Sequence, residues 1–554
     1  MKKWIAMCLS MAFVLGLFGC GEGDPDGRPP ETINTDQTQL YVSNYDGGYG
    51  TEWLYAIKDR FEADYAETSF EEGKKGVQIV IHADKDGYAG SDLFNKMGIT
   101  SDEVFFSESV TFNDYVSSGY MLDISDVVRS ENLDGKTIES KMSPEQRTSL
   151  KIGGNYYCIP HYASFTGINY DIDLFDAKKF YYAKNGAPSE EHYTGTVAYT
   201  NLAGERSAGP DGEYGTYDDG LPATYDEFFA LCGYMKNPHN VTPICWTGQY
   251  RATYMSWILA ALATDYEGKE QMMLNYEFDG TAKNLARIVG SELVFDENDT
   301  EITNANGFEL YRSAGRYYAL QFLERILDNN YYHECGFGDA SAASAQSTYL
   351  RSSQKNQPIA MLLEGIWWEN EADDTFDQMA KRYGDKWSMK NRNFGYMPFP
   401  KVSTEESKKA TIMDDHYSYA FIRKNISPVK VDLAKLFLKY CNTDRSLQEF
   451  TRIVGLPKAL KYDMDENTEW KSTYSENVWR FYETSDRVYP ISQNPLYLSA
   501  QSAFVYYRTF ATATQKHAID ALYNGVSAEE QFDGIKDMMT QTKWEETYSR
   551  FIEK

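Results

Sequence analysis

The fold class follows from one stretch, Leu40-Tyr41-Val42-Ser43-Asn44-Tyr45-Asp46-Gly47-Gly48-Tyr49-Gly50, in which a short apolar strand runs into a glycine-rich turn. Downstream, Trp53, Ile57, Phe61 and Tyr65 have helical spacing. Two further strand-like runs follow, at residues 77–81 and 103–106. Strand, glycine-rich turn, helix and strand is the order of a βαβ unit, so we expect an α/β fold.

The chain is too long for a single hydrophobic core. It has 554 residues, of which 42% are hydrophobic and 25% charged, as in ordinary soluble globular proteins. We therefore expect at least two lobes. The glycine-rich turn could hold phosphate, but no GxxxxGK[ST] pattern follows it, so a nucleotide is a weak candidate ligand.

The N-terminus has the pattern of an export signal. Met1-Lys2-Lys3 is a short basic start, and a mostly apolar run from Trp4 to Phe18 follows it. The run is shorter than the roughly 20 residues that span a bilayer, which disfavours a transmembrane anchor; an ordinary signal peptide is the other alternative. Leu17-Phe18-Gly19-Cys20 resembles the lipobox of a bacterial lipoprotein signal. That resemblance implies cleavage before Cys20, diacylation of Cys20 and anchoring to the lipid membrane.

Residues 21–38 contain almost no large apolar side chain. Such a segment cannot bury enough surface to offset its ordering entropy, so it predicts a flexible tether.

Charge and aromatic content narrow the ligand class. The net charge of −28 argues against nucleic acid and anionic lipid surfaces as partners, since both need a basic patch. Aromatic residues make up 15% of the chain, with 44 Tyr and 10 Trp. Their flat apolar faces and polar edges suit sugar rings, although for any single ring the core is the simpler assignment.

Five cysteines remain after the signal and the lipidated residue are set aside. They are widely spaced and form no CxxC pair: Cys158, Cys232, Cys245, Cys335 and Cys441. This pattern is neither a disulfide framework nor a zinc motif. We expect buried free thiols, or at most a pair or two of them joined.

Ordered segments along nearly the whole mature chain resemble one known family. They are the first strand with its glycine loop, Asp102–Phe106, Leu122-Asp123-Ile124, Asn155–Pro160, Ile168-Asn169-Tyr170, Pro222–Glu227, Pro243-Ile244, Glu364-Gly365-Ile366-Trp367, Met397–Pro400 and Ala420–Lys424. In this order, behind a lipobox, they are similar to extracellular solute-binding proteins of family 1, the maltose-binding-like receptors of carbohydrate ABC importers.

The resemblance implies a type II periplasmic-binding fold, with two α/β lobes, a hinge and a ligand cleft between the lobes. Mapped onto this chain, the N-lobe comprises residues 39–162 and 419–478, and the C-lobe residues 163–418 and 479–554. It also implies that the protein is a monomer without a required cofactor. Such a receptor would capture an oligosaccharide at the cell surface or periplasmic face and deliver it to permease subunits.

Ligands of such folds bind where strand ends meet helix starts. The loops after the expected strands, together with family positions, supply the candidates, which are Asp46, Gly48, Glu108, Trp246, Gln249, Tyr250, Glu364, Trp367, Asp415, His416, Tyr417 and Tyr506. Asp46 could accept hydrogen bonds from sugar hydroxyls, unless the turn is only a tight turn. Trp367 occupies the Gly-x-Trp position that stacks a sugar ring in maltose-binding relatives; interlobe packing is its alternative role.

Two other function classes stay open. The adjacent pair Asp414-Asp415 could suggest a lipid-anchored carbohydrate-active enzyme. Neighbouring residues on a strand face opposite sides, however, and no GxSxG or HExxH motif is present, so we expect no enzymatic activity. A receptor for a non-sugar solute, such as a peptide, is the third possibility. Arg251 near the expected cleft would suit an acidic glycan.

An insertion of about residues 176–221 departs from the family pattern and is too long for an ordinary connection. It ends in a glycine-rich acidic loop at residues 209–220. Clustered carboxylates among glycines suit calcium, so we consider a structural calcium site formed by Asp211, Glu213, Asp218 and Asp219. The loop is not an EF-hand, and a solvated acidic turn is the alternative.

Overall fold

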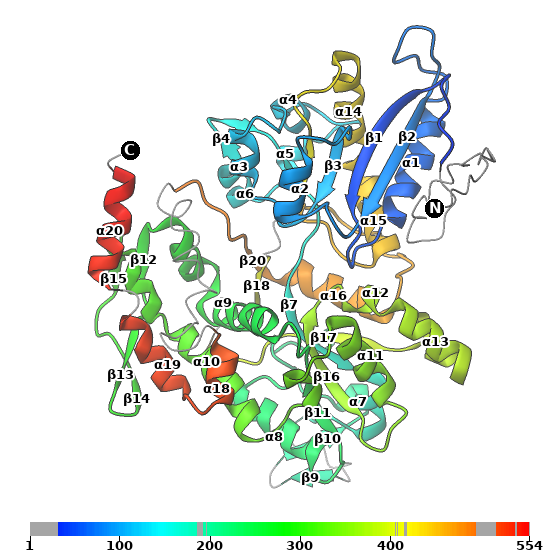
Figure 1. The fold of residues 1–554 in the computed structure, drawn as a ribbon. Helices are drawn as coiled ribbons and strands as arrows, with labels where there is room; N and C mark the ends of the chain where they lie inside the picture. The colour runs from blue at the N-terminus through cyan, green and yellow to red at the C-terminus, as the bar shows by residue number, and fades with distance from the viewer. Residues whose placement is uncertain are drawn as a thin grey trace, which may run out of the picture.

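In the computed structural model, residues 31–184, 192–194, 197–404, 406, 408–414, 418–494, 517–537 and 540–552 are described. They form two lobes, drawn one above the other in Figure 1. The predicted α/β class and two-lobe architecture are confirmed. Cys20 and the rest of the expected signal lie outside the described residues, as does most of the expected tether.

The N-lobe is built on a five-stranded sheet in the order β2-β1-β3-β19-β6. Its strands are β1 (Thr38–Tyr45), β2 (Val77–Asp84), β3 (Val104–Ser107), β6 (Ile159–Pro160) and β19 (Tyr419–Ile422). The first three run parallel, and β19 is antiparallel to both β3 and β6. Leu40 and Val42 of β1 are fully buried, as expected where helices cover a parallel sheet.

The N-lobe helices come from two separate parts of the chain. They are α1 (Glu52–Asp64), α2 (Gly90–Lys96), α3 (Phe112–Ser117), α4 (Ser125–Arg129), α5 (Ile138–Lys141), α6 (Pro144–Ser149), α14 (Pro428–Cys441) and α15 (Asp444–Val454), with the short strands β4 (Lys151–Ile152) and β5 (Asn155–Tyr156). Helices α14 and α15 pack on α1, and α14 also contacts β1 and β19. The late return of the chain to the N-lobe therefore completes its core.

The C-lobe is built on a four-stranded sheet in the order β11-β16-β7-β17. Its strands are β7 (Thr166–Asp171), β11 (Thr242–Cys245), β16 (Ile359–Gly365) and β17 (Phe394–Met397). Strands β11 and β16 are parallel, and β7 is antiparallel to its neighbours β16 and β17. The carboxyl ends of β11 and β16 and the start of β7 thus lie at one edge of the sheet, which faces the N-lobe (Figure 1).

Helices surround this second sheet. The longest is α9 (Arg251–Glu277), which is interrupted at Gly268, where φ is 73°. The others are α7 (Ile172–Lys178), α8 (Tyr225–Lys236), α10 (Ala314–Asp328), α11 (Ala342–Ser352), α12 (Trp368–Glu371), α13 (Asp373–Tyr383), α16 (Thr473–Thr484), α18 (Ala518–Tyr523), α19 (Ala528–Gly534) and α20 (Gln541–Ile552). The 3₁₀ turns are η1 (Ala203–Glu205), η2 (Gly307–Arg312), η3 (Glu334–Phe337), η4 (Asp385–Trp387), η5 (Met389–Asn391) and η7 (Ile535–Asp537).

Small two-stranded sheets lie in the C-lobe and at the hinge. They pair β12 (Gly280–Ala282) with β15 (Thr300–Ile302), β13 (Ala286–Val289) with β14 (Glu292–Phe295), and β18 (Thr411–Met413) with β20 (Asp486–Val488). The parallel pair β18–β20 contacts α9 and lies between the lobes in Figure 1. No helix in the described ranges is both long enough and apolar enough to cross a membrane.

Helix α16 corrects the predicted lobe boundary at residue 478. The helix is one continuous element that packs against β17, so the boundary would cut through it. Tyr474 donates to Asn169 of β7, and Asn477 accepts the backbone N–H of Tyr396. The helix therefore belongs to the C-lobe, and the chain leaves the N-lobe in the crossover of residues 455–472.

The insertion forms a small sheet attached to the C-lobe. Its strands are β8 (Tyr181–Tyr182), β9 (His192–Thr194) and β10 (Val197–Thr200), in the antiparallel order β8-β10-β9. Tyr199 stacks on Tyr234 of α8 with ring centroids 4.1 Å apart, and the Tyr182 hydroxyl donates to the carbonyl of Glu227. The insertion thus packs on α8 and is an extension of the C-lobe.

A buried lysine lies where the crossover meets the N-lobe core. Lys458 is 2% exposed, and its Nζ lies 2.6 Å from Nδ1 of His161, itself 2% exposed. The rings of Trp53 and Phe450 also surround the ammonium group, at 4.6 and 4.2 Å. Burial lowers the pKa of Lys458 to about 7, an effect only partly opposed by Cys441. Burial, with the charge of Lys458, also lowers the pKa of His161.

We predict that Lys458→Met stabilises the protein at pH 7 and that the gain disappears near pH 10.5. Between these values the unfolded chain binds a proton that the folded chain does not, so wild-type stability falls as the pH falls through the window. The expected gain at pH 7 is roughly 2 to 4 kcal/mol, measured by thermal or denaturant unfolding. Lys461→Met, at an exposed neighbouring lysine, is the matched control. An equal effect at pH 7 and pH 10.5 would contradict the prediction.

Candidate ligand-binding site

On the N-lobe side, hydrogen-bonding groups gather in the loops after β1 and β3. Thr51, at the start of α1, donates to Oδ1 of Asp46 at 2.8 Å. The Tyr162 hydroxyl donates to Glu108 at 2.5 Å, and Tyr45 hydrogen-bonds the same carboxylate. Burial and the charge of Glu108 raise the pKa of Tyr45, so its hydroxyl stays protonated. This side presents carboxylates and hydroxyls held in place by neighbouring side chains.

On the C-lobe side, an aromatic strip runs along the first turns of α9. Tyr250, Tyr254 and Trp257 have the spacing that places side chains on one helix face. Tyr250 is 47% exposed, and the other two are partly exposed. Trp367, directly after β16, meets Trp257 edge to face with ring centroids 6.3 Å apart. The C-lobe therefore contributes several aromatic rings.

The two sides touch at Gly48. A Cβ at this position would lie 2.6 Å from Cβ of Trp367, so only glycine allows this approach. Nδ2 of Asn370 donates to the carbonyl of Gly48 at 2.9 Å. Close by, Lys85 of the N-lobe pairs with Glu371 of α12 at 3.1 Å. The lobes are thus in direct contact beside the aromatic strip, and Trp367 is only 7% exposed.

The charged side chains at this junction shift the pKa values of neighbouring groups. Burial would lower the pKa of Lys85, but the charges of Glu371, Glu108 and Asp46 raise it. Glu371 also raises the pKa of Tyr45 and that of Tyr254, from opposite lobes. These groups therefore share one electrostatic neighbourhood, which we call the interlobe site: Tyr45, Asp46, Gly48, Lys85, Glu108, Tyr254, Trp257, Trp367 and Glu371.

Glu364 lies beneath this surface and does not form part of it. Its side chain is fully buried, and burial, followed by the charge of Glu371, raises its pKa well above the usual range. Its Oε1 accepts the backbone N–H of Gly365 at 3.0 Å, and the neighbouring Tyr254 and Gln346 side chains oppose part of the rise in its pKa. Its predicted role as a ligand contact is therefore corrected to that of a support for Tyr254.

Trp246 is a second correction. It is fully buried, its Nε1 donates to the carbonyl of Gly336 at 2.9 Å, and it packs against Tyr332 and Phe337. A ring without exposed surface cannot stack on a ligand, so Trp246 is a core residue of the C-lobe. Gln249, which follows it, is exposed.

Among the other predicted contacts, Asp46, Gly48, Glu108 and Trp367 come together at the interlobe site, and Tyr250 lies at the end of the aromatic strip. Asp415, His416, Tyr417 and Tyr506 lie outside the described residues. The sequence reasoning missed Tyr254 and Trp257, although their spacing from Tyr250 could have revealed them. It also missed Lys85 and Glu371, for which no sequence signal stands out.

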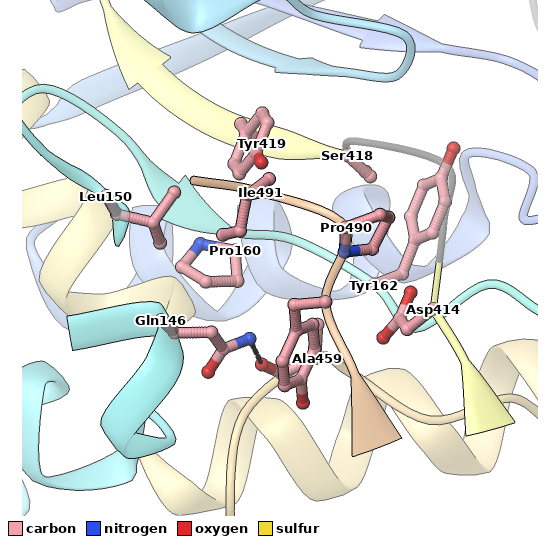
Figure 2. A pocket seen from close by; sticks show the side chains of 11 residues that line it. Gln146, Leu150, Pro160, Tyr162, Asp414, Ser418, Tyr419, Ala459, Pro490 and Ile491 are labelled. Atoms are coloured by element: carbon pink, nitrogen blue, oxygen red, sulfur yellow. Dashed lines mark hydrogen bonds between the residues drawn. The ribbon is translucent and has the colours of Figure 1, made fainter. Parts of the chain in front are cut away.

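Figure 2 shows a small pocket behind this junction, lined by Tyr162, Asp414, Ser418 and Pro490 among others. Its volume of about 30 Å³ holds water but no sugar ring. It adjoins a larger hollow of about 490 Å³ between the α5–α6 segment and α16. That hollow is large enough for a small ligand, but its tryptophan, Trp479, is as buried as Trp367, whereas Tyr254 and Trp257 of the interlobe site are partly exposed. The partly exposed rings favour the interlobe site for sugar stacking.

The predicted calcium loop brings two of its four carboxylates together. Asp218 is fully buried and accepts hydrogen bonds from the Thr216 hydroxyl at 2.7 Å and the Asp211 backbone N–H at 3.0 Å. Burial, together with the charge of Asp211, raises the pKa of Asp218 to about 7. Asp219 accepts the backbone N–H of Gly215, and Glu213 is exposed.

In the described part of the chain, no group of three or more His, Cys, Asp or Glu side chains is arranged to hold a metal ion. The acidic side chains of this loop therefore do not complete a calcium site by themselves, and calcium binding stays a prediction.

Solved structures of three receptors resemble this chain over nearly its whole length. One is a chitin oligosaccharide binding protein, 14% identical with a TM-score of 0.55, where the match covers 93% of this chain and 100% of that one. Another is the GacH receptor of Streptomyces glaucescens, solved unliganded and with acarbose, at 12% identity, TM-score 0.55 and coverage of 93% and 99%. The bacterial solute receptor AcbH matches at 11% identity, TM-score 0.55 and coverage of 92% and 99%.

The chain has the two-lobe fold of periplasmic solute-binding proteins. The fold that the sequence resemblance implied is thus confirmed. No family model and no curated protein matches the chain. Within the solute-binding fold, the interlobe site occupies the junction at which the edges of the two sheets face each other (Figure 1).

We predict that Asp218→Asn stabilises the metal-free protein at pH 8. The folded-state pKa of about 7 lies above the unfolded value, so stability is lost as the pH rises from about 4 to 7. Removing the charge should recover roughly 1 to 4 kcal/mol, seen as a higher Tm, whereas Glu213→Gln in the same loop should change little.

Adding calcium to the wild type distinguishes the two interpretations of the loop. A rise in Tm that Asp218→Asn lacks would support the calcium prediction. An unchanged wild-type Tm would leave the loop as a hydrogen-bonded acidic turn.

Proposed function

We propose that this protein is a carbohydrate receptor that captures an oligosaccharide between its lobes and delivers it to the permease of an ABC transporter. The observation that carries the proposal is the division of chemistry across the junction. The C-lobe offers the rings of Tyr254, Trp257 and Trp367, and the N-lobe offers Asp46 and Glu108. A sugar has an apolar face for the rings and hydroxyls for the carboxylates.

The structural relatives support a sugar as ligand. Their titles name chitin oligosaccharide, acarbose and β-D-galactopyranose as what those receptors bind. They are solute receptors rather than enzymes, which supports binding without turnover for this chain. A receptor for a non-sugar solute and a carbohydrate-active enzyme are the alternatives that the same experiment separates.

We predict that titration calorimetry with chitin oligosaccharides, acarbose, malto-oligosaccharides and galactose identifies at least one binding glycan. Trp367→Ala should weaken that binding about ten- to hundredfold, because a buried aromatic anchor at the centre of an interface carries much of the binding energy. Trp387→Ala, the same truncation at the end of η4, is the matched control and should bind as the wild type does. Circular dichroism checks that both variants fold.

The result that contradicts a carbohydrate ligand is a folded wild-type protein that binds no glycan. Binding of a peptide mixture under those conditions would favour the non-sugar alternative. Chromatography of the glycans after incubation tests turnover, and shortened products would favour the enzyme.

We further propose that the mature protein is held at the outer face of the membrane by a lipid on Cys20. The lipobox-like sequence at residues 17–20 supports this. The predicted tether of residues 21–38 is too long at its end, because Glu31 already pairs with Lys58 and Thr38 opens β1, so residues 21–30 would form the tether. A lipid anchor would keep the receptor near its transporter. Expressed in a bacterial host, the protein should begin at Cys20 with a mass increased by a diacylglycerol and fatty acid. Cys20→Ser should lack this lipid and be released from membranes.

A further inference from the structure

Two cysteines about 90 residues apart in sequence lie side by side in the C-lobe. Cys245 ends β11, and Cys335 belongs to the turn η3. The segment before η3 runs along β11, since Ile244 N–H donates to Tyr331 O at 3.0 Å and His333 N–H to Ile244 O at 2.8 Å. The two cysteines thus sit at the ends of hydrogen-bonded segments, where the backbone fixes their separation.

The two thiols lie close enough for each to shift the pKa of the other. Cys335 Sγ also lies 3.7 Å from the carbonyl of Trp246, the residue after Cys245. The described cysteines outside this pair, Cys158, Cys232 and Cys441, are buried, and burial raises the pKa of each thiol.

The pair is chemically asymmetric in the way that thiol–disulfide exchange requires. Cys335 is partly exposed, and its interaction with the Cys245 thiol, together with His333, lowers its pKa to about 5. Cys245 is fully buried, and burial raises its pKa. Since the thiolate is the attacking form, Cys335 can react first with an oxidant, and Cys245 is placed to complete the bond.

We propose that Cys245 and Cys335 form a disulfide in the exported protein. The proposal rests on the proposed function only for its extracellular location, because disulfides persist in oxidising compartments. Closing the bond sets the two sulfurs about 2.05 Å apart.

The oxidant is a protein disulfide of the cell envelope. The Cys335 thiolate attacks one of its sulfurs and displaces the other as a thiolate. Cys245 loses its proton, and its thiolate attacks Cys335 Sγ, releasing the oxidant's second thiolate. Two electrons pass to the oxidant, and its two thiolates take up the two protons that the cysteines lost, so that it becomes a dithiol.

This disulfide would act on the interlobe site through α9. The loop it closes contains all of α9, including Tyr254 and Trp257, and the cross-link lies just before that helix. Cross-linking a loop of this length restricts the unfolded chain and raises the stability of the folded one. The turn of residues 246–250, which leads into the aromatic strip, would be held by the disulfide at one end and by α9 at the other.

The test is to equilibrate the purified mature protein in a glutathione redox buffer, alkylate it and digest it without reduction. Mass spectrometry should find one peptide pair joining Cys245 to Cys335, two hydrogens lighter than the separate peptides. Cys441→Ser, which removes a buried thiol elsewhere, should keep this pair, and Cys335→Ser should lose it. The Tm should fall by a few degrees on reduction in the wild type and stay constant in Cys335→Ser.

Recovery of both cysteines alkylated from the oxidising buffer would overturn the proposal, and this outcome depends on no variant. Glycan binding is measured separately. A protein that forms the cross-link but binds no sugar would support the disulfide proposal and contradict the receptor proposal. A protein that binds sugar but forms no cross-link would do the reverse.

Discussion

The close approach of Gly48 to Trp367 is the contact on which the interlobe site depends. A side chain at residue 48 would occupy the space of the tryptophan Cβ, so the turn after β1 must carry glycine for the lobes to meet in this way. The contact fixes where Asn370 meets the Gly48 carbonyl and where Glu371 meets Lys85. The groups that face a ligand are therefore positioned by backbone geometry as much as by side-chain chemistry.

Buried ionisable groups lie close to this junction, and burying each of them costs desolvation free energy that the packing must offset. Glu364 is kept neutral beneath Tyr254, and Lys458 is held against His161 where the crossover enters the N-lobe. Isolated charges are expensive in such surroundings, so these side chains titrate away from their usual pH. Their hydrogen bonds fix the positions of the elements that bear the site, which an apolar core would specify less narrowly.

The sequence predicted the strands and much of the site for identifiable reasons. Apolar runs bounded by glycine mark β1 and β16. Gly48 follows from the rule that ligands bind at strand ends, and Trp367 from the Gly-x-Trp position of the family that the sequence resembles. Trp246 follows a strand in the same way, yet the segment of residues 331–337 covers it, a contact across 90 positions that no local pattern reveals. Tyr254 and Trp257 were missed because they lie inside a helix rather than in a loop. The boundary at 478 failed because α16 is amphipathic, and its sequence does not say which lobe it packs on.

The charge at the interlobe site bears on which glycans the proposed receptor would hold. The position of Arg251 in the sequence suits an acidic glycan, but its Nε pairs with Asp520 at 2.8 Å within the C-lobe. Across the junction, Asp46, Glu108 and Glu371 all lie near Lys85, and that lysine already pairs with Glu371. A glycan carboxylate would meet an excess of like charge there, at a cost that desolvation increases. We therefore infer that neutral glycans fit this site better than acidic ones, because hydroxyls donate to carboxylates without adding negative charge.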